Sequence, residues 1–71
     1  MEEDSQIIEM LLTELYSKGN EIFNSVNNFN NWLNNPSIDL AGKKPIDSIQ
    51  TREGINELLN ILSRIEHGIL A

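Results

Sequence analysis

Few side chains in this sequence could carry out chemistry, and those few lie near its C-terminal end. The chain has one His, His67, and no Cys, so it offers no thiol nucleophile, no disulfide and no metal centre built from several His or Cys ligands. Ser63 precedes His67 by four residues, a spacing that can bring both side chains to one helix face. Solvated polar residues near a helix end explain this pair more simply. We therefore expect no enzyme activity, no cofactor and no metal.

The distribution of charge also restricts the function. The formal net charge is −6, and of the five basic residues only Lys43 and Lys44 are adjacent. Binding to a nucleic-acid backbone requires clustered cations, so we expect no direct nucleic-acid binding by this chain alone. An acidic surface favours a basic protein partner instead.

Length and hydropathy place the chain among small domains without a membrane segment. No apolar run approaches the roughly 20 residues that span a bilayer, and the acidic segment 1–4 is unlike the basic start of a signal peptide. We therefore expect a cytoplasmic protein. Its 71 residues form one domain, 1–71, with a small stability margin, so stability from a second copy in a homodimer is expected.

The segments that would position these residues all have helical patterns. Gly19 could end a first helix at a turn, but apolar residues keep their helical spacing on both sides of it, which favours one long helix over about residues 4–24. Gly19 lies near this apolar stripe, where it can let another helix approach closely. Ile8, Leu12 and Leu15 give the helix more apolar surface than one small core covers, which again favours a homodimer.

A second, short helix is expected to follow. Ser25 can cap its start, and Pro36 ends it because the residue before a proline avoids the helical region. Trp32 and Leu33 lie just before that stop, and we expect Trp32 to pack beneath the following loop rather than to stack on a ligand. The apolar face of this helix consists of Val26, Phe29, Trp32 and Leu33.

A loop over residues 36–44 and a short helix come next. Ile38 and Leu40 are expected to point inward as anchors of the loop, and Gly42 to supply a turn conformation. Pro45 suits the first turn of the short helix, because its missing N–H needs no partner there.

The last helix is predicted to begin at Thr51 and to end at Gly68. Thr51 is the expected N-cap, with Gly54 three residues later. An apolar stripe then follows, made of Ile55, Leu58, Leu59, Leu62 and Ile65. Beyond Gly68, residues 69–71 would form a short apolar tail that packs back, pairs with a second copy or enters a partner. The chain is thus predicted to be all-α, with about four helices, two long and two short, and no strands.

The order of several short motifs resembles one family. Residues 21–71 contain E-I-F, W-L-x-x-P, L-A-G-x-x-P, T-R-E-G and L-x-R-I-E-H-G in this order. Together they resemble the C-terminal toxin-binding domain of the MbcA/ParS/Xre antitoxins, with residues 1–20 an N-terminal helix outside the resemblance. Ala41 stands where the family has the first Gly of a pair, and Asn24 where a Gly is common; neither change is expected to threaten the fold.

The resemblance implies a type II antitoxin. The implied partner is a RES-domain toxin, an enzyme that acts on NAD or uses it to modify a target, and the domain would mask the toxin's active site with its C-terminal end. The matching partner-binding positions are Arg64, Glu66, His67, Gly68, Ile69 and Leu70. The positions implied to be structural are Trp32, Leu33, Pro36, Leu40, Gly42, Pro45, Thr51 and Gly54.

Two further expectations follow from this comparison. Many members of the family carry an N-terminal helix-turn-helix domain, whereas residues 1–20 are predicted here to form a single helix, so operator binding by this chain is not expected. The alternative function is a stand-alone helical dimerisation or adaptor domain that binds a different protein.

Overall fold

The fold consists of three α-helices and two short 3-10 helices. The computed structural model describes the backbone of residues 2–70 and the side chains of residues 5–68. In chain order, its elements are α1 (Glu2–Phe23), α2 (Val26–Asn34), η1 (Ile38–Leu40), η2 (Pro45–Ser48) and α3 (Arg52–Leu70). The described backbone contains no strand. The predicted all-α class and the two long and two short helices are confirmed, with η1 as an additional turn.

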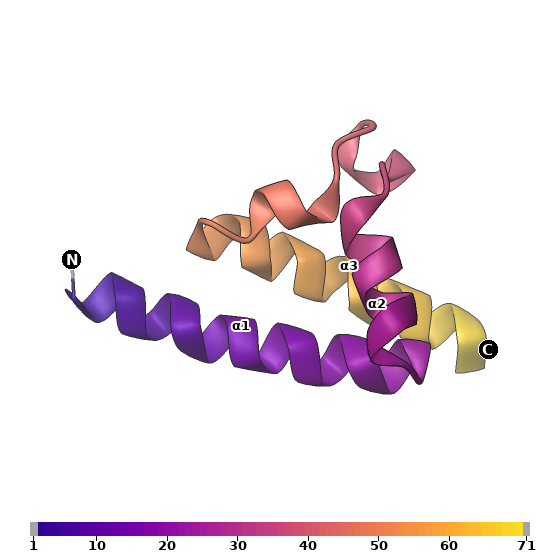
Figure 1. Ribbon diagram of the computed structural model, residues 1–71, viewed down its shortest axis with the longest axis horizontal. Helices are drawn as coiled ribbons and strands as arrows, with labels where there is room; N and C mark the ends of the chain where they lie inside the picture. Colours follow the sequence, from indigo (N-terminus) through magenta and orange to yellow (C-terminus); the bar gives the residue numbers. More distant parts are fainter. Residues whose placement is uncertain (1, 71) are drawn as a thin grey trace.

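The two long helices determine the shape of the molecule. α1 and α3 lie side by side and run in the same direction, while α2 turns steeply away from the end of α1 (Figure 1). Ile8 near the start of α1 shares a hollow with residues 50–53 at the start of α3, and Lys18 near the end of α1 pairs with Glu66 near the end of α3. The chain returns from α2 to the start of α3 through η1 and η2.

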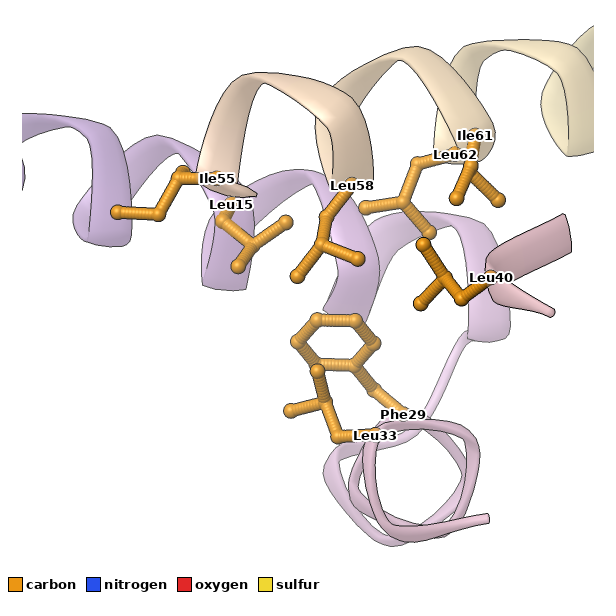
Figure 2. Close-up of a cluster of buried hydrophobic side chains, with 8 residues drawn as sticks. All are labelled: Leu15, Phe29, Leu33, Leu40, Ile55, Leu58, Ile61 and Leu62. Atoms are coloured by element: carbon orange, nitrogen blue, oxygen red, sulfur yellow. The ribbon is translucent and has the colours of Figure 1, made fainter. Parts of the chain in front are cut away.

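One apolar cluster holds the three α-helices together. Phe29 and Leu33 extend from α2 toward Leu15 of α1 and the side chains of α3 (Figure 2). The buried members of the cluster are Leu15, Phe29, Leu33, Leu40, Ile55, Leu58, Ile61 and Leu62. Ile61 was not part of the predicted stripe of α3. It is buried because α1, α2 and the loop all pack around α3, so the buried face is wider than a single stripe.

α1 continues through Gly19, as predicted. A Cβ built at Gly19 would overlap the ring of Phe29, so the bare backbone of α1 allows α2 to approach closely. Phe29 is fully buried there. Its ring stacks on that of Trp32 with the centroids 5.8 Å apart and meets the ring of Tyr16 edge-on at 5.4 Å. Trp32 is half-buried in this aromatic cluster, which makes it a packing residue of α2.

The predicted start and stop of α2 are both confirmed. Ser25 has an extended backbone, and its hydroxyl oxygen accepts a hydrogen bond from the Asn28 N–H at 3.2 Å. The helix ends at Asn34, two residues before Pro36. Asn24, just before the cap, has a φ of 57°. Asn tolerates this left-handed conformation better than most residues, which explains how it replaces the Gly expected there.

The loop between α2 and η2 is a closed turn with one side chain directed inward. The Ser37 N–H donates to the Lys43 carbonyl at 3.0 Å, and the Gly42 N–H donates to the Ser37 carbonyl at 2.8 Å. Gly42 has a φ of 86°, as its predicted turn role requires. Ala41 is also left-handed, with a φ of 57°, and this costs a non-Gly residue about 1 kcal/mol.

The prediction that Ile38 and Leu40 both anchor the loop was wrong for Ile38. Leu40 is buried, whereas Ile38 is 98% exposed. The two residues lie in a 3-10 helix, where about three residues complete a turn, so side chains two residues apart point in different directions. Only one of them can face the core.

The start of α3 is as predicted, but its end is not. The Thr51 hydroxyl accepts a hydrogen bond from the Gly54 N–H at 3.0 Å and caps the helix, and Pro45 occupies the first position of η2. The helix does not end at Gly68 and continues to Leu70. The tail expected to leave the helix at Gly68 is therefore helical in its backbone, because a Gly near a helix end lowers helix stability without breaking the helix.

Candidate partner-binding surface

The last turns of α3 extend beyond the apolar core. The last fully buried side chain of the helix is Leu62, and Ile65 is only half-buried against the cluster. Arg64, His67 and Gly68 are exposed. Three of the six predicted partner-binding residues thus lie together on the surface at this end of the helix. The side chains of Ile69 and Leu70 fall outside the described residues.

Glu66 has a partner within the chain itself. Its carboxylate lies 3.5 Å from the Lys18 Nζ, and both side chains are about one-third exposed, at 34% for Glu66 and 32% for Lys18. A pair this accessible to water is largely screened and contributes at most about 1 kcal/mol. It nevertheless joins the C-terminal parts of α1 and α3.

One exposed cation, Arg64, lies one turn before Gly68. Within residues 5–68, the only ion pair is that of Lys18 with Glu66, so Arg64 has no acidic partner among them. The guanidinium of Arg64 presents a rigid fork of donors suited to carboxylates and backbone carbonyls. His67 stands in the last turns of the helix, where a basic side chain can approach the unpaired carbonyl groups. This surface is suited to a partner that supplies hydrogen-bond acceptors.

Gly68 presents bare backbone on this surface. Apart from its two chain neighbours and the backbone of its own helix, a Cβ built at Gly68 would have no heavy atom within 4 Å. Arg64 and Ile65 precede it by four and three residues and so lie on the same side of the helix, one turn earlier. The fold therefore leaves open space over the backbone at Gly68.

A second feature of the surface was missed by the sequence analysis. The loop exposes Lys43 and Lys44 as well as the apolar side chain of Ile38. The three-residue period of a 3-10 helix could have revealed it, since Ile38 and Leu40 cannot both face inward. Figure 1 places this loop away from the C-terminal end of α3. Met10 and Val26 are the other large apolar side chains that are exposed among the described residues.

The residues at the start of α3 surround a hollow of about 220 Å³. Its walls are formed by Ile8, Gln50, Thr51, Arg52 and Glu53. Over the part of the chain that the structure describes, no group of three or more His, Asp or Glu side chains could hold a metal ion, and no helix is long and apolar enough to cross a membrane. The hollow lies at the opposite end of α3 from Gly68.

Comparison with known proteins gives one result. Residues 18–68 match the model of the antitoxin Xre/MbcA/ParS C-terminal toxin-binding domain. No curated protein and no solved structure matches the chain. The match begins in the last part of α1, includes α2 and both 3-10 helices, and ends at Gly68 in α3.

Proposed function

Because the chain belongs to the antitoxin Xre/MbcA/ParS C-terminal toxin-binding domain family, we propose that it binds and neutralises a RES-type, NAD-using toxin by masking the toxin's active site. The family match over residues 18–68 carries this proposal, since a toxin-binding domain implies a protein toxin as partner. The protein acts by binding and not by catalysis, in the cytoplasm where such a toxin would act.

The contact surface of this proposal is the C-terminal end of α3. Its members are Arg64, Glu66, His67, Gly68, Ile69 and Leu70. Arg64, His67 and Gly68 are exposed in the free chain, so a partner can reach them without unfolding any part of the core. Glu66 differs from them, because one of its carboxylate oxygens already pairs with Lys18.

A homodimer is a second part of the proposal. Leu15 is fully buried within the single chain, so it is not available to another copy. Toward the N-terminus, Ile8 and Leu12 are only half-buried, so part of their apolar surface stays open to a second α1, whereas the exposed Met10 lies on the other side of the helix. Light scattering that finds only the 8.1 kDa species at high micromolar concentration would exclude the dimer.

The proposal also predicts that this chain does not bind duplex DNA. Six of its eleven acidic residues and only one of its five basic residues lie within residues 1–24, so α1 is strongly acidic. Such a helix is repelled by a phosphate backbone. A salt-sensitive shift of its own promoter fragment by the purified chain at submicromolar concentration would disprove this part.

The main test begins with the genes beside this one, among which the proposal expects a gene that encodes a RES-domain protein. Expressed alone, that protein should stop growth and lower cellular NAD, and co-expression of this chain should restore both. The double variant Arg64→Ala/His67→Ala should lose most of the protection while remaining folded, because both side chains are exposed. Arg52→Ala is the matched control, since Arg52 is exposed at the other end of α3.

The outcomes of this test separate the two candidate functions. Protection by the wild-type chain and the control, together with loss in the double variant, supports the antitoxin and its surface. A wild-type chain that neither binds nor protects against the RES-domain protein would overturn the proposal and favour the helical adaptor. Protection that survives in the double variant would move the contact surface elsewhere.

A further inference from the structure

Three of the four glycines have a clear role within the chain. Gly19 leaves room for the ring of Phe29, and Gly42 adopts a φ of 86° that few other residues reach easily. Gly54 leaves room for the carbonyl oxygen of Ser48. Each of them would be difficult to replace even in an isolated molecule.

Gly68 has no such role. It lies inside α3, is exposed, and has open space where a Cβ would stand. A Gly weakens a helix compared with Ala, because the Gly backbone loses more conformational freedom when it becomes helical. The isolated chain would therefore be more stable with Ala at this position.

We infer that Gly68 is a close-approach point for the partner: the toxin's main chain packs directly against the helix backbone at Gly68, where a Cβ would keep the two apart. This inference rests on the proposed function, which supplies the partner. Its second support is that the match to a toxin-binding domain extends to Gly68. Contact between the toxin and the bare backbone at Gly68 would explain why the helix has a glycine there that lowers its own stability.

The neighbours of Gly68 indicate what the partner must offer. Ile65, one turn earlier on the same side, packs against the core and holds that part of the helix in place. Arg64 is exposed beside it, with its guanidinium fork available. The partner surface is therefore a narrow cleft that meets the helix backbone, with carboxylate or carbonyl oxygens one turn away to accept from Arg64. Without the close approach at Gly68, the Arg64 side chain would reach these acceptors less well.

The test compares two substitutions at Gly68 with a control on the same helix. Ala and Leu both favour helices, so Gly68→Ala and Gly68→Leu differ mainly in bulk. Asn56→Ala is the control, because Asn56 is exposed in α3 and lies 12 residues, or about 18 Å, from Gly68. Melting of each free chain is followed by circular dichroism, and the affinity for the purified RES-domain protein by titration calorimetry.

The inference predicts opposite effects on stability and on binding. Gly68→Ala should raise the melting temperature of the free chain by about 2–6 °C and weaken toxin binding roughly tenfold. Gly68→Leu should weaken binding roughly a hundredfold, since its side chain is larger. Asn56→Ala should also raise the melting temperature, without any change in affinity.

Several results would overturn the inference. Unchanged affinity in both Gly68 variants would show that no partner backbone lies there. A lower melting temperature for Gly68→Ala would show that the free chain itself requires Gly, and equal losses for Ala and Leu would point to backbone flexibility rather than close approach. If the wild-type chain fails to bind the toxin at all, the proposed function falls and this inference with it. If the wild-type chain binds and the Gly68 variants bind equally well, the proposed function stands and only this inference falls.

Discussion

The two ends of α3 use the same residue type in opposite ways. Gly54 is the third residue of the helix, and Gly68 is the third from its end. At the start, a Cβ on Gly54 would overlap the Ser48 carbonyl oxygen, and Ile55 next to it is fully buried. At the end, the space over Gly68 is empty. The start of α3 therefore packs against the rest of the chain, whereas its end has open space that another molecule could occupy.

This difference shows that a glycine's role depends on its surroundings. Both glycines stand in short motifs of the sequence, T-R-E-G and R-I-E-H-G, and nothing in these letters distinguishes a closely packed position from an open one. The distinction appears only when the rest of the chain is placed around them. Because the start of α3 is fixed within the fold, its end can carry a binding surface without a cost to the core.

The largest expected effect is at the packed end. Gly54→Ala should destabilise the chain by about 2–3 kcal/mol, because the new methyl group meets a backbone carbonyl that cannot move aside easily. This is a large fraction of the stability of so small a domain. Urea unfolding measures it, and Gly68→Ala, the same substitution on the same helix, is the matched control that should stabilise. A Gly54→Ala chain as stable as the wild type would remove the contrast between the two ends.

A smaller effect is expected at the N-cap of α3. Thr51→Ala removes the hydroxyl that accepts from the Gly54 N–H, and the loss of such a cap costs about 1 kcal/mol. The melting temperature should fall by roughly 4–8 °C. Thr13→Ala is the control, since Thr13 is exposed in α1 and its hydroxyl donates to the Glu9 carbonyl without capping a helix. Neither variant should change the affinity of the folded chain for the toxin; a loss of affinity in Thr51→Ala would extend the binding surface to this end.

The sequence predicted those features that depend on a few neighbouring residues. Ser25, Pro36, Gly42 and Thr51 act through their own backbone or the next turn, and the structure confirms each of them. Such local devices can be recognised without knowledge of the tertiary structure.

The incorrect predictions concern residues whose position depends on distant parts of the chain. The inward direction assigned to Ile38 failed because the loop forms a 3-10 helix, in which only Leu40 reaches the core. Ile61 was omitted because the extra width of the buried face comes from α1, α2 and the loop together. Gly68 was expected to end α3, since Gly often does so, but Gly can also stay in a helix.

The location of the partner-binding site stays a prediction, although part of it agrees with the exposure of the residues. The resemblance pointed to the end of the last helix, and the structure finds Arg64, His67 and Gly68 exposed there. The sequence could not show that Glu66 pairs with Lys18, because these residues are brought together only by the parallel packing of α1 and α3.

The central claim is that the end of α3 binds the toxin while the rest of the chain holds the fold, and removal of residues 68–71 tests it most directly. The described core ends at Ile65, so melting of the shortened chain should stay within about 5 °C of the wild type, a change of about 1 kcal/mol or less. Its affinity for the RES-domain protein, measured by calorimetry, should fall by roughly two to four decades. A shortened chain that melts normally and still binds and neutralises the toxin at equal dose would contradict the account.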